Sequence, residues 1–119
     1  MSLLVTIRTA DLGAGVQKSA PADRLIEGNP EITVWDQDAS HGGRVRSGVA
    51  DLGVGTTRSM KGGDCEVVHI ISGVAELTEE GGETRTFRAG DSFVMKPGFT
   101  GVWKTVETVR KVFTVISGA

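Results

Sequence analysis

The segment CEVVHIISGVAELTE, residues 65–79, gives the strongest indication of a β fold. It is rich in valine and isoleucine, whose β-branched side chains favour strands over helices. Gly73 divides it, so we predict two strands, at 65–71 and 73–79. Because side chains alternate across a strand, one face of the first strand carries a carboxylate among apolar groups. That face is Glu66, Val68 and Ile70, and the opposite face is Cys65, Val67, His69 and Ile71.

The rest of the chain has the same strand-forming composition. Valine, isoleucine and threonine number 15, 6 and 12 among 119 residues, while 17 glycines and three prolines separate short runs, as many tight turns require. No segment has the pattern of an amphipathic helix. The pattern predicts an all-β sandwich or barrel, with further strands at 3–8, 31–36, 44–52, 55–60, 83–88, 91–95, 100–107 and 109–116.

Two connecting segments have patterns of their own. Glu79-Glu80-Gly81-Gly82 predicts a hairpin turn, because glycine adopts the positive φ that such turns need. Residues 9–30, rich in Ala, Gly, Asp, Asn and Pro, are typical of an irregular arm that crosses the surface, covers a sheet edge or contacts a partner subunit.

Size and charge exclude several classes of protein. The length predicts one domain, and 13 basic against 15 acidic side chains give a net charge of -2, too weak a field to attract nucleic acid or an anionic membrane. The single cysteine, Cys65, forms neither an intramolecular disulfide nor a four-cysteine zinc site. Without a signal-like leader or an apolar run of about 20 residues, we expect a soluble cytoplasmic protein in a reducing compartment.

Residues 53–73 resemble the first motif of the cupin superfamily, G(X)5HXH(X)3-4E(X)6G. Gly53, Glu66 and Gly73 stand at the motif's spacing, but Ser59 and Lys61 occupy the two histidine positions.

Residues 90–101 resemble the second cupin motif, G(X)5PXG(X)2H. Gly90 and Gly98 match, Pro97 comes one place late, and Gly101 falls at the histidine position. Roughly residues 20–117 are also similar to single-domain members of the cupin branch named after (S)-ureidoglycine aminohydrolase.

The resemblance implies an all-β RmlC-like jelly roll, the cupin double-stranded β-helix, with a small-molecule pocket inside and a dimeric assembly. It implies one domain overall, in which residues 1–30 form an N-terminal strand and the irregular arm, and residues 31–119 form the cupin barrel. The fold does not fix the function.

Most cupins hold a divalent metal on three histidines and one glutamate. The four positions here are Ser59, Lys61, Glu66 and Gly101, of which only Glu66 is a competent ligand. Counting three residues to Glu66 instead of four moves the pair to Met60 and Gly62, which are no better. Selective metal sites need several convergent ligands, so we expect no metal cofactor, although the sequence leaves a weak divalent site open.

The parity of the strands predicts what lines the pocket. Trp103 and Thr105 share the face of Gly101, so an indole occupies the space of a metal centre. Trp103 is either a core residue or the wall of a site for a planar or sugar-like ligand. For Glu66 three roles remain open: part of a structural ion pair, a solvent-facing group at the barrel mouth, or the acidic group of a ligand site whose cation is Lys61 or Lys111. The candidate pocket is Ser59, Lys61, Glu66, Val68, Gly101, Trp103 and Lys111.

The remaining polar residues are interpreted as structural. His69 and Cys65 lie on the outer face of their strand, roughly 13 Å apart, so they form no catalytic pair. We expect His69 to be a packed or hydrogen-bonded strand residue in a face that favours a dimer interface, and His41 to lie in an exposed turn. Trp35 is expected beneath a sheet or at an interface, and a basic sheet edge with no partner is expected from Arg44, Arg46 and Arg58.

Three functions follow from these patterns. The preferred one is metal-free binding of a small molecule inside the barrel, without nucleic acid or membrane as partner. An alternative is a hydrolase or isomerase resembling ureidoglycine aminohydrolase, with Glu66 as acid or base and Lys61 as a second catalytic group. The third is a structural or regulatory subunit that uses the apolar outer face in an oligomer, most simply a homodimer.

Overall fold

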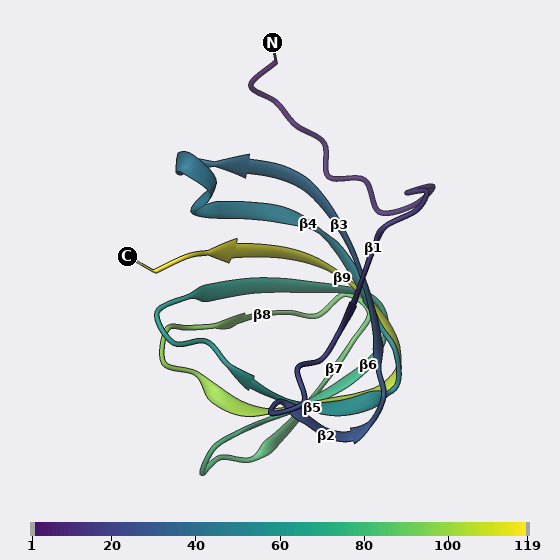
Figure 1. Cartoon of the computed structure of the whole chain (residues 1–119), viewed down its shortest axis with the longest axis vertical. Helices are drawn as coiled ribbons and strands as arrows, with labels where there is room; N and C mark the ends of the chain where they lie inside the picture. The colour runs from purple at the N-terminus through teal and green to yellow at the C-terminus, as the bar shows by residue number, and fades with distance from the viewer. Residues whose placement is uncertain (1, 119) are drawn as a thin grey trace.

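Two long antiparallel strands form the centre of the structure, a computed structural model that describes residues 2–118 (Figure 1). β6 (Cys65–Glu79) and β9 (Thr100–Ile116) pair from Cys65 opposite Ile116 to Glu79 opposite Gly101. The other strands are β1 (Val16–Ser19), β2 (Leu25–Gly28), β3 (Glu31–Ser40), β4 (Val45–Leu52), β5 (Gly55–Met60), β7 (Thr84–Arg88) and β8 (Ser92–Met95).

Each half of the β6–β9 pair is extended by different strands, all antiparallel. The first half of β6 and the second half of β9 lie between β8 and β4, with β3 and β1 beyond β4. The second half of β6 and the first half of β9 lie between β7 and β5, with β2 beyond β5. Figure 1 shows the sheet curled around one interior, which agrees with the predicted all-β jelly roll.

The two long strands bend where the two halves meet. The register between β6 and β9 shifts three times between Ile70 and Ala75, and such bulges bend a strand and increase its twist. Gly73 lies at this point with a φ of 91°, and a Cβ there would overlap the carbonyl oxygen of Thr108 on β9. A residue without a side chain is therefore required at the bend.

The apolar core fills the interior beside this bend. Trp103 of β9 and Met95 of β8 pack against apolar side chains of β6, and four phenylalanine and leucine side chains are partly buried around them. The buried cluster is Val68, Ile70, Ala75, Leu77, Met95, Trp103 and Val109.

Most of the predicted strands are present, with three differences. The segments 65–71 and 73–79 form the single strand β6, and 100–107 with 109–116 form β9, because the chain bends without leaving the sheet. The strand expected at 3–8 does not form, and the expected irregular segment 9–30 contains β1 and β2. The predicted hairpin turn joins β6 to β7, with Gly82 N–H donating to the Glu79 carbonyl at 2.8 Å.

Helix is almost absent, as the sequence predicted. Within residues 2–118 the one helical segment is a 3-10 turn, His41–Gly43, which places His41 in an exposed turn. No helix in this part of the chain is long and apolar enough to cross a membrane.

The N-terminal segment extends away from the barrel, but hydrogen bonds hold its inner part against the outer face (Figure 1). The backbone of Arg8 exchanges two hydrogen bonds with the side chain of Gln37, and Trp35 Nε1 donates to the Gly13 carbonyl at 3.1 Å. The Arg110 guanidinium lies 5.3 Å from the centre of the Trp35 ring. Trp35 therefore packs between the sheet and this segment.

The basic sheet edge expected from Arg44, Arg46 and Arg58 does not exist. β4, which carries Arg46, lies between β3 and β9, and β5, which carries Arg58, lies between β2 and β9. Arg44 lies in the turn before β4. Neither strand is an edge, so these arginines do not protect one.

The bend yields a prediction about stability. Replacement of Gly73 by alanine should lower the free energy of unfolding by roughly 2–4 kcal/mol, because the new Cβ combines an unfavourable φ with a steric overlap. Gly90→Ala is the matched control, since Gly90 has a φ of 93° but nothing within 4 Å of its Cβ position. Urea denaturation of both variants measures the difference, and equal losses would show that the contact with Thr108 is unimportant.

Candidate functional site

A buried carboxylate lies at the centre of the candidate site. Glu66 lies near the start of β6, opposite Met95 of β8 and Val115 of β9, and is only 7% exposed. Val68 and Ile70 are buried on the same face, whereas Val67 and His69 are exposed, so the alternation predicted from the sequence is present. A buried carboxylate is stable as an ion only when it is paired.

Two lysines supply that pairing. Lys61 Nζ, from the start of the β5–β6 connection, lies 2.8 Å from Glu66 Oε1, and Lys111 Nζ, from β9, lies 2.7 Å from Glu66 Oε2. The lysine side chains are themselves 18% and 11% exposed. Each carboxylate oxygen thus accepts one short, charge-assisted hydrogen bond.

This pairing decides the ionisation of Glu66. Burial alone would raise its pKa, but the positive charges of Lys111 and Lys61 and their hydrogen bonds outweigh burial and lower the pKa of Glu66 from 4.5 to about 2. Glu66 is therefore an anion at neutral pH and has no proton to donate.

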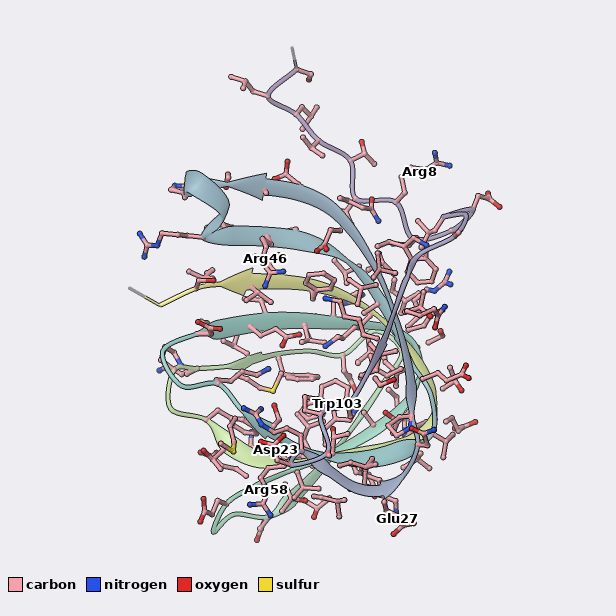
Figure 2. The ribbon with its side chains drawn as sticks, in the orientation of Figure 1. Arg8, Asp23, Glu27, Arg46, Arg58 and Trp103 are labelled. Atoms are coloured by element: carbon pink, nitrogen blue, oxygen red, sulfur yellow. The ribbon has the colours of Figure 1, made fainter. Side chains whose placement is uncertain are left out.

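Trp103 forms an apolar wall beside the ion pairs, and Figure 2 shows it inside the curl of the sheet. Its Nε1 donates to Thr105 Oγ1 at 2.9 Å, and Lys111 Nζ lies 4.9 Å from its ring centre. Both Trp103 and Thr105 are buried, as the strand parity predicted. A cation over the ring face is attracted by the indole quadrupole, which fixes the Lys111 ammonium between Trp103 and Glu66.

Two cavities meet at this cluster. The smaller, of about 170 Å³, contains Ser59, Lys61 and Trp103 in its lining. The larger, of about 240 Å³, lies toward β1, β3 and β4, with Arg46 in its lining (labelled in Figure 2). Leu52, Glu66 and Lys111 line both, so the ion pairs separate two parts of one interior.

A third cavity, of about 240 Å³, lies toward β7 and β8 and shares Met95 with the smaller cavity. Its lining includes Phe87, Phe93 and Phe99, and its charged groups, Glu79, Glu83 and Arg85, have no ion pair within the described residues. It lacks the convergent polar groups that usually orient a ligand, so the cavities beside Glu66 are the stronger candidate.

The structure brings together five of the seven residues that the sequence assigned to the pocket. Ser59, Lys61, Glu66, Trp103 and Lys111 line the smaller cavity. The other two do not line it: Val68 is fully buried in the core, and Gly101 lies beside the outer groove formed with Thr78 and Glu79.

Gly101 stands at a histidine position of the cupin motif, and its surroundings leave no room for a side chain. A Cβ on Gly101 would overlap the carbonyl oxygen of Thr78 and approach the Phe99 ring to 3.0 Å. The neighbouring backbone therefore occupies the space where a histidine side chain would begin. A return of histidine at this position requires the strand to move.

Several lining residues were not anticipated from the sequence. Arg24 and Met95 line the smaller cavity, and Lys18 and Arg46 line the larger one. A signal existed for Arg46: it shares the parity of Ala50 and Leu52 on the predicted strand 44–52, and both are inward residues in the structure. Arg24 and Lys18 come from the segment interpreted as irregular, where no alternation could place them.

The residues of the site do not fit the metal centre of most cupins. Among the four ligand positions, only Glu66 has a side chain of a kind that binds metals well, a carboxylate. Both of its oxygens accept hydrogen bonds from lysine ammonium groups. Residues 2–118 contain no cluster of three or more His, Cys, Asp or Glu side chains able to hold a metal ion. A metal at Glu66 would have to displace two cations.

The remaining histidine lies outside this site. His69 Nδ1 and Ser92 Oγ share a hydrogen bond of 2.7 Å on the exposed face between β6 and β8. This matches the expected structural role, and His69 has no contact with the Glu66 cluster.

The fold and these motifs define a cupin. Residues 39–113 match the EutQ-like cupin domain, so the chain belongs to the EutQ-like cupin family. No protein with a curated description matches the chain.

Solved structures share the fold. A protein of unknown function from Pseudomonas syringae pv. tomato has a TM-score of 0.78 and 22% identity over 87% of this chain, which spans 45% of that protein. The EutQ protein of Clostridium difficile has a TM-score of 0.64 and 16% identity over 84% of this chain and 80% of its own. A predicted oxalate decarboxylase from Thermotoga maritima has a TM-score of 0.66 and 13% identity over 94% of this chain and 98% of its own.

The ion pairs predict how stability depends on pH. The pKa of Glu66 falls from 4.5 in the unfolded chain to about 2 in the folded one, so its charge contributes on the order of 3 kcal/mol above about pH 4.5. This contribution is lost as the pH falls through about 2. Glu66→Gln should therefore be much less stable than the parent at neutral pH, and the difference should narrow between about pH 4.5 and 2.

Urea denaturation at a series of pH values measures this difference. Glu80→Gln is the control, because Glu80 is an exposed turn residue without an ion pair in the described structure. A constant difference between Glu66→Gln and the parent across this range would contradict the depressed pKa of Glu66.

Proposed function

We propose that the protein binds a small molecule inside the barrel, where the two cavities meet at Glu66 and Lys111, without the metal of most cupins. The observation that carries this proposal is the pairing of buried Glu66 with Lys61 and Lys111 beside Trp103. Buried ion pairs are often no more stabilising than apolar packing of the same volume. Ligand sites, in contrast, concentrate a few convergent polar groups on an apolar wall.

The enzymatic alternative rests on the similarity to the ureidoglycine aminohydrolase branch. The ionised state of Glu66 counts against a general-acid role, because the carboxylate has no proton to donate near neutral pH. Both carboxylate oxygens are also engaged by lysines, which weakens Glu66 as a base. We therefore prefer binding to turnover.

The oligomeric alternative rests on the outer face of β6. Val67 lies opposite Val94 of β8, and both are exposed. Two valines cover far less than the roughly 800 Å² that each partner contributes to a typical stable interface. This patch supports the expected homodimer only as part of a larger surface, and it indicates no separate function.

The metal-free part of the proposal predicts the metal content. Protein purified without an affinity tag should contain much less than one metal ion per chain by elemental analysis, and Glu66→Ala should not change that value. Addition of Zn²⁺, Mn²⁺ or Ni²⁺ should not raise the melting temperature. Near-stoichiometric metal that disappears in Glu66→Ala would overturn this part.

Binding can be followed through Trp103. The chain has two tryptophans, so Trp35→Phe leaves Trp103 as the only one. Three probes of similar size, the dianion succinate, the neutral succinamide and the cation putrescine, are titrated while its emission is recorded. At least one should give a saturable change, because a ligand in the smaller cavity contacts the indole or moves Lys111.

Lys111→Met in the same background provides the matched variant. Glu66 keeps its pair with Lys61 in this variant, so the fold should persist. The affinity for the probe should fall about tenfold or more. No saturable change with any probe, or one that Lys111→Met leaves intact, would count against binding at this site.

A further inference from the structure

The charges that line the barrel are not balanced. Lys61 and Lys111 are largely buried, yet Glu66 supplies only one negative charge between them. One positive charge is therefore left in a region of low dielectric, where an uncompensated charge is costly. Each ammonium has three N–H donors and uses one of them on Glu66, so both retain donors for a further anion.

The rest of the lining adds to this excess. The two cavities together are lined by the cations Lys18, Arg24, Arg46, Lys61 and Lys111, against the anions Asp36 and Glu66. Lys18 and Asp36, both at the larger cavity, are exposed. Arg58 borders the smaller cavity, but the alternation along β5 places its side chain on the outer face with that of Met60. Five cations against two anions line the interior of a chain whose net charge is -2, so positive charge is concentrated there.

The cations form two groups, one at each cavity. Lys61 and half-buried Arg24 lie at the smaller cavity, and no ion pair of Arg24 is present within residues 2–118. Arg46 and Lys18 lie at the larger cavity, where Arg46 pairs with Asp36 at 4.0 Å and the Asp36 side chain is about half exposed. Such a long, exposed pair is weak, which leaves the guanidinium available. Lys111 lies between the two groups.

Arg46 lies on β4 and Lys111 lies on the neighbouring strand β9. Lys111 lies opposite Ala50, and Ala50 is four residues from Arg46, roughly 13 Å along the strand. Both residues line the larger cavity, and the half-exposed Arg46 side chain is long enough to reach toward Lys111 across it. The arrangement therefore suits a short molecule with an acidic group at each end.

We infer that the ligand of the barrel is a small organic dianion of the dicarboxylate class, with one carboxylate on Lys61, Lys111 and Arg24 and the other on Arg46. This inference rests on the proposed function, and it adds the chemical class of the ligand. Arginine is suited to the second contact because its planar guanidinium binds a carboxylate through two parallel hydrogen bonds. Trp103 and Leu52 cover the methylene groups between the acids.

Calorimetric titration with four probes tests the ligand class. Succinate, the monoanion acetate, succinamide and putrescine are each added to the parent chain in about 150 mM salt, which screens long-range attraction to a cationic surface. Succinate should bind in a saturable 1:1 manner and at least about tenfold more tightly than acetate. Succinamide and putrescine should not bind.

Arg46→Gln separates the two ends of the ligand. It should weaken succinate binding about tenfold and leave acetate binding unchanged, because acetate uses only the Lys61–Lys111 end. Arg44→Gln is the matched control, two residues away in an exposed turn that lines neither cavity, and it should bind succinate like the parent.

The outcomes separate this inference from the function on which it rests. Binding of succinamide or putrescine in the absence of succinate binding would overturn the dianion while leaving a ligand site in the barrel. Equal affinities for succinate and acetate, or equal losses for both in Arg46→Gln, would overturn the second carboxylate contact. Saturable binding of none of the four probes would overturn both proposals.

Discussion

The pairing of β6 with β9 is the constraint on which both the barrel and the site depend. The two strands run through both halves of the curled sheet. β4 and β5 pair directly with β9, and β7 and β8 pair directly with β6. They also supply the central groups of the site: Glu66 comes from β6, and Trp103 and Lys111 come from β9. The strand register that holds the sheet together thus also sets the position of the carboxylate relative to its cation and its aromatic wall.

The sequence predicted those parts of the molecule that repeat locally. Alternation along residues 65–71 placed Glu66 and Val68 on one face, and the resemblance to the cupin motif implied that this face is the inward one. Motif spacing placed Lys61 beside Glu66. The continuity of β6 could not be predicted, because Gly73 interrupts the alternation although the chain stays in the sheet. β1 and β2 were missed because they are short, exposed strands that are stabilised by distant partners in β3 and β5. Lys18 belongs to β1 and Arg24 immediately precedes β2, so their approach to the cavities had no local signal.

The departure from the cupin metal motif is more than a loss of histidines. At Gly101 the backbone around Thr78 fills the space in which a side chain would start. At the carboxylate, two ammonium groups surround Glu66 and carry the same total charge as a divalent ion. The barrel thus keeps a cationic centre against the buried carboxylate of Glu66, but this centre is made of hydrogen-bond donors. Donors of this kind orient an anion and supply no coordination site.

The central position of β9 has a consequence for how the chain reaches its native state. β9 follows all the other strands of residues 2–118, yet it pairs with β4, β5 and β6. Until it has been synthesised, β4 and β5 lack their shared neighbour, and the inward faces of β4, β5 and β6 lack Trp103, Val109 and Phe113. Contacts between segments so distant in sequence make folding slow. Until β9 has been synthesised, a nascent chain on the ribosome exposes unpaired strand edges and apolar strand faces. This barrel therefore depends on protection during translation more than a fold that closes from its N-terminus onward.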